Sequence, residues 1–295
     1  MTVRTANDGD LDSIRQVARR ALVFDDDAAD VVDVLWSAPT TQPDLRVVTE
    51  AFGQVTGFAL GSLRTATSRD GHIDMFAVDP DRGGAGAGHA LLSTLEDRLR
   101  AERVERLRIG GNTPYFGWPG IDIRYTGALC LARSSGYQQV RDGHNMTVEL
   151  AAAPLSTAAD EERLAATGIT VRRLQAAELD AIDGWVRAFG GTWHIELALA
   201  AAADPSRVHV ALRGEQYVGF ACHGVNRRGW FGPMGTDTSE RGSGIGTVLL
   251  RRCLDDMREA GLTVADIGWV GPYQFYWHSV GATLTKTYWI FEKAA

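Results

Sequence analysis

The stretch TDTSERGSGIGTVLL, residues 236–250, sets three glycines directly before the apolar pattern of a helix. Gly242, Gly244 and Gly246 carry no Cβ atom, so the backbone N–H groups at the start of the helix stay open to a ligand. Such a helix start favours a phosphate or pyrophosphate, although an ordinary tight turn would use the same residues. The stretch therefore predicts an anion-binding loop and an amphipathic helix that ends at Gly261.

Two common nucleotide-binding loops do not fit this stretch. A P-loop needs a lysine before its Ser or Thr, and Thr247 follows Gly246 with no lysine between them. A dinucleotide-binding fold has its glycines after the first strand of a βαβ unit, whereas these glycines follow several segments that alternate like antiparallel strands. The loop therefore indicates a different phosphate-binding fold.

The chain carries a second stretch of the same kind, VDPDRGGAGAGHALL at 78–92. The glycines of the two stretches align in pairs, Gly86 with Gly244 and Gly88 with Gly246. The start of the chain is repeated as well, because 2–14 and 170–182 share Thr-Val-Arg, Leu-Asp and Ile at the same spacing. Internal similarity at several points of the chain predicts two domains of the same fold.

We expect an N-terminal domain of residues 1–150 and a C-terminal domain of residues 168–295. Residues 151–167 between them are rich in Ala, Ser, Thr and charged side chains, which is typical of a linker. The hydrophobic pattern of the C-terminal domain predicts strands at 169–174, 206–214, 216–229, 229–237, 262–270 and 283–293, and helices at 176–189, 194–203, 245–260 and 275–281.

Composition narrows the class of protein. The chain has 295 residues, of which 45% are hydrophobic and 23% charged, and its net charge is −7. It has no run of Lys or Arg, so we expect no nucleic-acid partner.

Its three cysteines lack the spacing of metal ligands and cannot all pair, so we expect neither a metal site nor a disulfide framework. It has no signal-peptide pattern and no long apolar run, so we expect a cytoplasmic protein that does not bind membranes. The oligomeric state stays open.

The Arg-x-x-Gly-x-Gly pattern that starts at Arg241, with the helix and strand after it and the segment FYWHSVGA at 275–282, resembles the GCN5-related N-acetyltransferase (GNAT) superfamily. The resemblance covers each half once, and within the superfamily it is similar to the glucosamine/glucosaminide N-acetyltransferases. It implies an α/β fold of two tandem domains, each a mostly antiparallel twisted mixed sheet with flanking helices and a splayed pair of parallel strands.

The same resemblance implies a cofactor and a reaction. The cofactor is acetyl-CoA, and an amine attacks its thioester directly, without a covalent enzyme intermediate. Loop N–H groups would bind the pyrophosphate, and N–H groups of the preceding strand would stabilise the oxyanion. The cofactor-binding residues implied for the second half are Met234, Gly235, Thr236, Arg241, Gly242, Ser243, Gly244, Ile245, Gly246 and Thr247. Those implied for the first half are Gly84, Gly86 and Gly88.

By the resemblance, a tyrosine after a phenylalanine donates the proton that the departing thiolate needs. Tyr276 after Phe275 fits this role, although counting back from Gly281 without a gap gives Trp277. Tyr276 is the nearby residue with a hydroxyl acid of the right type, so we expect it to be catalytic.

The first half departs further from the family pattern. Gly83 stands in place of the loop arginine, with Arg82 displaced by one residue, and Ala132 stands in place of the tyrosine. Asp74 occupies a position where family members often place a carboxylate base, and the second half has Gly232 there. We therefore expect a degenerate N-terminal domain that at most holds the cofactor, and a catalytic C-terminal domain.

The acceptor is expected to be the primary amine of a small polar molecule, preferably an amino sugar. Trp193, His194, Glu196 and Trp230 are the expected acceptor-binding residues, with packing between the domains as the alternative. The general base stays open among His194, Glu196 and His223. Alternative acceptors are an aminoglycoside-like antibiotic and a thiol-cofactor precursor. A further alternative is a catalytically silent CoA-binding sensor, which the intact second-half motif argues against.

Overall fold

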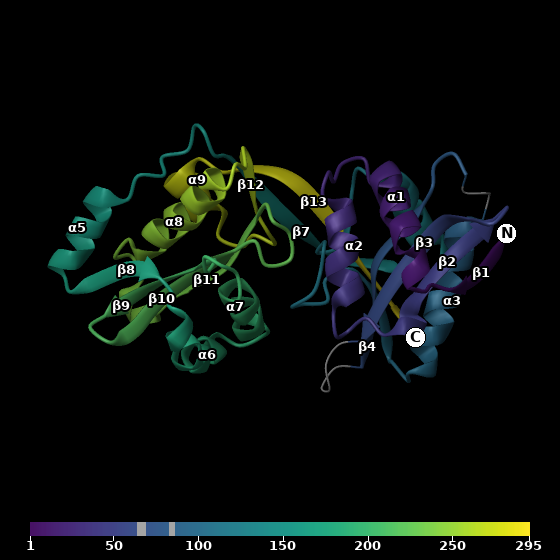
Figure 1. Ribbon diagram of the computed structural model, residues 1–295, viewed down its shortest axis with the longest axis horizontal. Coiled ribbons are helices and arrows are strands. Elements are labelled where there is room, and N and C mark those ends of the chain that lie inside the picture. The colour runs from purple at the N-terminus through teal and green to yellow at the C-terminus, as the bar shows by residue number, and fades with distance from the viewer. Residues whose placement is uncertain (64–68, 83–85) are drawn as a thin grey trace. The chain divides into compact units, whose positions relative to one another are not determined.

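The computed structural model describes residues 1–63, 69–82 and 86–295 (Figure 1). They form two compact units. The first unit consists of Met1–Gly143 and Thr287–Ala295, and the second of His144–Lys286. Among the expected site residues, Gly84 lies outside the described residues, as does Gly83.

The first unit is a sheet with helices on both faces (Figure 1). Its strand order is β1 (Thr2–Thr5), β2 (Arg46–Ala51), β3 (Gln54–Leu63), β4 (Asp70–Val78), β5 (Arg106–Ile109) and β13 (Thr283–Ala294), with the short β6 (Ile121–Asp122) beside β13. The α-helices are α1 (Leu11–Ala21), α2 (Ala28–Ser37), α3 (Ala87–Ala101) and α4 (Thr126–Ser134), and the 3-10 helices are η1 (Asp8–Asp10) and η2 (Pro43–Leu45). Side chains alternate along β2, so that Val48 faces α1 and α2 while Val47 faces α3.

The second unit repeats this layout. Its strand order is β8 (Ile169–Arg173), β9 (Val208–Arg213), β10 (Gln216–His223), β11 (Trp230–Thr236), β12 (Val264–Ile267) and β7 (Gln138–Glu149). Its α-helices are α5 (Ala158–Ala166), α6 (Leu179–Val186), α7 (Trp193–Ala201), α8 (Ile245–Glu259) and α9 (Tyr273–Val280), and its 3-10 helices are η3 (Ala176–Glu178), η4 (Arg187–Phe189) and η5 (Thr238–Glu240). Helices α5 and α8 share a core on one face, and α6 and α7 share a core on the other.

The last strand of each half completes the sheet of the other unit. Strand β7 follows α4 in the chain, yet Met146 to Glu149 pair with β12. Strand β13 follows α9, yet Phe291 to Ala294 pair with β5. The compact units consequently part the chain at other residues than 150 and 168, and the division into domains at those two residues stays a prediction.

In each unit a pair of parallel strands separates at the same point. Strands β4 and β5 pair as far as Ile73 with Ile109, and β11 and β12 pair as far as Phe231 with Ile267. The next residue of β4, Asp74, falls where the register with β3 shifts, which makes it the extra residue of a β-bulge. The register between β10 and β11 shifts over the matching residues Gly232 and Pro233.

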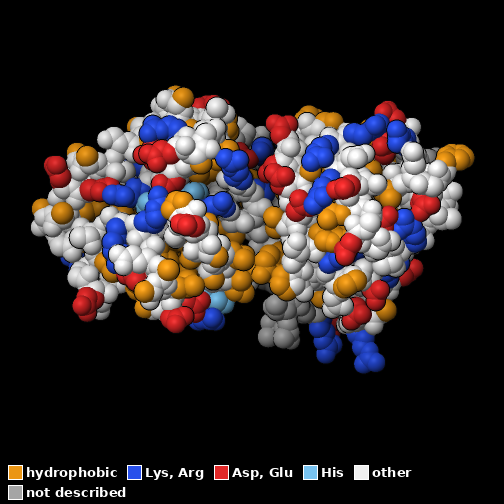
Figure 2. All heavy atoms as spheres, viewed as in Figure 1, with side chains coloured by type: hydrophobic (Ala, Val, Ile, Leu, Met, Phe, Trp, Pro, Cys, Tyr) orange, Lys and Arg blue, Asp and Glu red, His pale blue; other side chains and the backbone are white. Residues whose placement is uncertain are grey.

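These features confirm the predicted fold class of two tandem mixed α/β repeats with splayed parallel strands. On the face shown in Figure 2, Lys and Arg side chains are interspersed with Asp and Glu side chains and form no basic patch. Within residues 1–63, 69–82 and 86–295, no helix has both the length and the apolar composition that crossing a bilayer requires.

Candidate active site

The second glycine loop leads into α8 through left-handed backbone. Gly242 has φ +85° and Gly244, the N-cap of α8, has φ +98°, conformations that glycine adopts without strain. The Ile245 side chain is fully buried, so this residue offers the loop only its backbone. Within the described residues, no hydrogen bond engages the N–H groups of Gly242, Gly244, Gly246 or Thr247. The loop therefore presents open donors at a helix N-terminus, as an anion site requires.

Two arginines lie at this loop. Arg241 is exposed at its start, as the sequence predicts. Arg163 reaches it from α5, where its Nη1 donates to the Ser243 carbonyl oxygen at 2.7 Å. Arg163 lies in the predicted linker, so the sequence did not indicate it as a site residue. The available signal was the helical spacing of Asp160, Arg163 and the buried Leu164.

Helix α5 is fixed on α8 by ion pairs. Arg252 binds Glu161 at 2.6 Å, and Arg251 binds Asp160 at 3.2 Å. The same Asp160 also contacts Arg163 at 3.2 Å. These contacts hold the Arg163 guanidinium at the loop, where it adds positive charge to the site.

Tyr276 on α9 lies beside the splayed strand β11. Its ring stands edge-on to Phe231 at 6.2 Å between centroids and to Phe275 at 5.0 Å. A Cβ atom at Gly246 would lie 3.3 Å from Phe275 Cζ and 3.4 Å from Met234 Cε. The structure thus brings the predicted loop, strand and tyrosine together.

The Tyr276 side chain is buried, whereas the alternative Trp277 is 58% exposed. Among the described residues, nothing forms a hydrogen bond with the Tyr276 hydroxyl. Burial raises the pKa of Tyr276 above its usual value, so the hydroxyl keeps its proton at neutral pH. An uncommitted, protonated hydroxyl is what a general acid needs.

One of the expected acceptor-binding residues of α7, Trp193, contacts Phe189. Trp193 stacks on Phe189 at 5.8 Å, and a Cβ at Gly235 would lie 2.7 Å from Phe189 Cε1. Phe189 therefore joins Trp193 to the strand that precedes the loop. His194 is half-buried in the first turn of the same helix, and no described contact joins it to Gly235.

Glu196 is buried on α7, where its Oε1 accepts a hydrogen bond from Thr192 Oγ1 at 2.9 Å. Burial raises the pKa of Glu196 to about 7, and the Thr192 contact offsets this only in part. Trp230 is buried under Arg227, whose guanidinium lies 5.1 Å from the ring centroid. Trp230 is thus buried at the start of β11, and its predicted role in acceptor binding stays a prediction.

His223 belongs to a separate polar network. Its Nε2 lies 3.3 Å from Asp256 on α8, and His209 Nε2 lies 2.8 Å from the same oxygen. Arg173 binds both oxygens of Asp256 at 2.7 Å. Asp256 thus engages Nε2 of His223, and Nδ1 is the ring nitrogen left for another contact.

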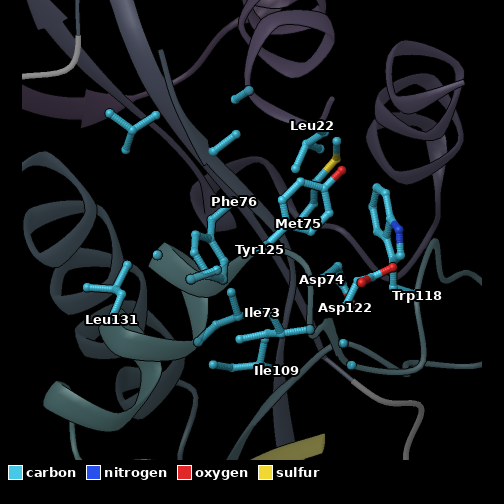
Figure 3. A pocket seen from close by; sticks show the side chains of 18 residues that line it. Leu22, Ile73, Asp74, Met75, Phe76, Ile109, Trp118, Asp122, Tyr125 and Leu131 are labelled. Carbon is cyan, nitrogen blue, oxygen red and sulfur yellow. The ribbon is translucent and has the colours of Figure 1, made fainter. Parts of the chain in front are cut away.

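The first unit contains a pocket of about 370 Å³ where β4 and β5 separate (Figure 3). Ligand-binding pockets commonly have volumes of a few hundred Å³ or more. Its walls come from the end of α1, from β4, β5 and β6, and from α4. The lining side chains are mostly apolar, and the polar ones are Asp74, Trp118, Asp122 and Tyr125.

Asp74 is the bulge residue of β4, and it is buried. Both of its carboxylate oxygens lack a hydrogen-bond partner among the described residues. Burial raises the pKa of Asp74 to about 7, and the Ser62 hydroxyl opposes the rise. This carboxyl group therefore lies inside a cavity and not in solvent.

The other polar side chains of the pocket are engaged. Tyr125 donates its hydroxyl proton to Asp25 Oδ2 at 2.8 Å, and Trp118 Nε1 donates to Asp25 Oδ1 at 3.2 Å. Asp122 is paired with Arg124 at 2.6 Å. Asp74 is thus the polar lining side chain whose charge nothing in the described pocket compensates.

The described part of the first glycine loop resembles its counterpart. Gly86 is the N-cap of α3 with φ +87°, as Gly244 is for α8. A Cβ at Gly88 would lie 2.9 Å from Leu131 Cδ2, and Leu131 lines the pocket. The loop and the pocket are therefore adjacent. Arg82, the displaced arginine, donates to Gln54 Oε1 at 2.8 Å.

Residues 11–114 and 175–272 match the model of the acetyltransferase (GNAT) family, and together they make up more than half of the chain. The chain belongs to the acetyltransferase (GNAT) family. The resemblance seen in the sequence is thereby confirmed, once in each half. This GNAT protein is an enzyme of the N-acetyltransferase class. Comparison with curated proteins gives no significant match.

Three solved structures share the tandem GNAT fold. A GCN5-related glucosamine N-acetyltransferase region of a fungal multi-domain GH3 β-N-acetylglucosaminidase has a TM-score of 0.81 at 17% identity, over 99% of this chain and 38% of that one. A GCN5-related N-acetyltransferase from Sphaerobacter thermophilus has a TM-score of 0.71 at 19% identity, over 99% and 95%. A tandem GNAT protein of the clavulanic acid biosynthesis pathway has a TM-score of 0.70 at 15% identity, over 99% and 97%. At these identities the likeness shows the fold alone.

Proposed function

We propose that this GNAT protein transfers the acetyl group of acetyl-CoA to a primary amine on a small polar molecule, with an amino sugar as the preferred acceptor. One combination of neighbouring features in the second unit supports the proposal. Open N–H groups at residues 242–247 adjoin a splayed strand pair and the uncommitted hydroxyl of Tyr276.

The proposed reaction uses these groups in turn. Backbone N–H groups of the loop, with Arg241 and Arg163, bind the pyrophosphate of acetyl-CoA. The amine nitrogen attacks the thioester carbon, and N–H groups near Met234 and Gly235 stabilise the oxyanion. The carbon–sulfur bond then breaks, and Tyr276 gives its proton to the thiolate.

Glu196 is the most suitable of the three candidates for the general base of the second unit. Its pKa of about 7 suits proton exchange at neutral pH. Its helix, α7, also carries Trp193, which Phe189 joins to β11. We therefore propose Glu196 as the acceptor of the amine proton, with Trp193 and His194 lining the acceptor site.

Acceptor choice gives a prediction. Glucosamine is expected to have a kcat/KM roughly tenfold or more above that of a lysine peptide, because the indole ring of Trp193, held by Phe189, suits a compact sugar ring better than an extended chain. The shared fold with a chain that contains a glucosamine N-acetyltransferase region supports this choice. Free thiol released from acetyl-CoA is followed over a panel of amines. Acetylation of lysine peptides with no acetylation of glucosamine would refute the preference. No turnover with any amine would favour the alternative of a catalytically silent CoA-binding sensor.

Cofactor binding gives another prediction. Acetyl-CoA is expected to raise the melting temperature, since it binds the folded state alone. Gly244→Val is expected to abolish the rise, because a β-branched side chain resists φ +98° and would project toward Arg163. Gly214→Val is the matched control, because Gly214 also has a positive φ, of +59°, but lies in the β9–β10 turn. If acetyl-CoA raises the melting temperature of Gly244→Val as much as that of the wild type, the tighter acetyl-CoA site would instead lie in the first unit.

A further inference from the structure

The Phe189 ring lies directly on the backbone of β11. Phe189 ends η4, and the neighbouring helices α6 and α7 cover the face of the sheet opposite α8 (Figure 1). A Cβ atom at Gly235 would lie 2.7 Å from Phe189 Cε1 and 3.0 Å from Phe189 Cζ. Such a contact is too short for a side chain at this position. The ring reaches the strand because residue 235 is a glycine.

The matching position of the first unit carries a side chain. Gly235 pairs with Phe220 on β10 in the same way as Ala77 pairs with Phe58 on β3. Ala77 is buried, and its Cβ atom takes up the space that an aromatic ring would need for the approach seen in the second unit. The glycine therefore makes room for Phe189 in the unit that carries Tyr276.

Three aromatic side chains hold Phe189 in place. Trp185 and Phe220 stand edge-on to it, at 5.0 and 5.8 Å between ring centroids, and Trp193 stacks on it at 5.8 Å. Phe220 is fully buried, whereas Phe189 is only half-buried. The Phe189 ring is thus fixed by its packing and still open to a ligand in part, as the wall of a binding site must be.

This wall adjoins the segment of β11 that faces the thioester in the proposed function. In that function, N–H groups near Met234 and Gly235 bind the carbonyl oxygen, beyond the point where β11 and β12 separate. The acyl chain is attached to the same carbon atom as this oxygen. Its first carbon atoms therefore lie beside Gly235, where the Phe189 ring is packed.

We propose that Phe189 determines which acyl group the second unit transfers, because its ring leaves room for an acetyl group and excludes longer acyl chains. The inference rests on the proposed function, which places the thioester at β11. Because Trp185 and Trp193 pack against the ring, it does not move aside for an added methylene. One methylene in an apolar site changes kcat/KM by roughly 10- to 200-fold, so a single rigid ring is sufficient for this selection.

The experiment compares donors that differ only in the acyl chain. With one amine that the wild type acetylates, kcat/KM is measured for acetyl-, propionyl- and butyryl-CoA from the released thiol. The wild type is expected to prefer acetyl-CoA to propionyl-CoA by roughly tenfold or more. Phe189→Ala removes the ring from Gly235, so it is expected to raise the propionyl-to-acetyl ratio of kcat/KM by roughly tenfold or more.

A milder variant separates selection from folding. Phe189→Leu keeps an apolar side chain in the cluster and shortens the wall, so its ratio should fall between those of the wild type and Phe189→Ala. Its melting temperature should stay closer to that of the wild type than the melting temperature of Phe189→Ala does. Because each ratio compares two donors on the same enzyme, a smaller folded fraction does not alter it.

Phe76→Leu is the matched control. Phe76 is also a half-buried phenylalanine, but it belongs to β4 and lines the pocket of the first unit. Because it lies in the other unit, its substitution should leave the propionyl-to-acetyl ratio at the wild-type value. A ratio that rises in Phe76→Leu and not in Phe189→Ala would place donor selection in the first unit and overturn the inference.

The remaining outcomes separate the inference from the proposed function. An unchanged ratio in Phe189→Ala would overturn the inference, as would a wild type that uses propionyl-CoA as well as acetyl-CoA. Both results leave the proposed function intact, because acetyl transfer continues. No turnover with any donor would refute the proposed function. The Kd values of acetyl-CoA and propionyl-CoA, measured by calorimetry, would then replace kcat/KM, and a Kd ratio that Phe189→Ala does not change would overturn the inference.

Discussion

Tyr276→Phe is expected to lower kcat for amines acetylated in the second unit by about 10²- to 10⁴-fold, the usual contribution of a general acid. The substitution keeps the ring between Phe231 and Phe275 and removes one proton donor. Because the hydroxyl forms no hydrogen bond with the described residues, its loss breaks no structural contact. The Kd of acetyl-CoA, measured by calorimetry, and the melting temperature should therefore stay near their wild-type values.

Trp277→Phe is the matched control, because Trp277 is the neighbour that an alignment without a gap would choose. Its side chain points to solvent, so its removal should leave kcat unchanged. Undiminished turnover in Tyr276→Phe together with a large loss in Trp277→Phe would reverse the assignment. Loss in both variants, with weakened acetyl-CoA binding, would indicate a packing role for α9.

Local patterns predicted most of the fold. The glycines before α3 and α8 fixed both helix starts, because their positive φ angles and open N–H groups are local properties. Such patterns could not predict that β7 pairs with β12 of the second unit and that β13 pairs with β5 of the first unit. Phe291 and Met146 would alternate equally well beside either sheet, and the choice of partner strand depends on contacts far away in the sequence.

The candidate site was predicted in part, for similar reasons. The sequence favoured Tyr276 over Trp277 without showing how either side chain is placed, and in the structure Tyr276 is buried while Trp277 is exposed. The catalytic role of Tyr276 stays a prediction. The first half was expected to be degenerate because Ala132 stands at the tyrosine position, although Asp74 stands at the position of a carboxylate base. The pocket around it is closed by Trp118 and Tyr125, which local patterns could not place beside β4.

The cost of burying Asp74 is expected to appear as pH-dependent stability. Its pKa rises from 3.8 in the unfolded chain to about 7 in the folded one, so the folded state holds a proton that the unfolded state loses. Stability is therefore lost as pH rises from about 4 to about 7, by as much as about 4 kcal/mol. The amide group that Asp74→Asn introduces cannot titrate. The free energy of unfolding of the variant should therefore rise relative to that of the wild type by about this amount between these pH values.

Urea unfolding of both proteins near pH 4 and near pH 8 measures this gain as a change in the difference of their free energies of unfolding. The cost of burying an Asn amide shifts the difference equally at both pH values, so it cancels. Asp10→Asn is a control whose titration lies below this pH range, because the hydrogen bond with Arg4 lowers the pKa of Asp10 from its ordinary value of 3.8. The difference between that variant and the wild type should therefore stay nearly constant from about pH 4 to about pH 8. A difference for Asp74→Asn that stays constant with pH would mean that Asp74 is not a desolvated carboxylate. A difference that follows the expected course would show that the fold sacrifices stability to keep an unpaired carboxyl group in a cavity, as proteins do at functional sites.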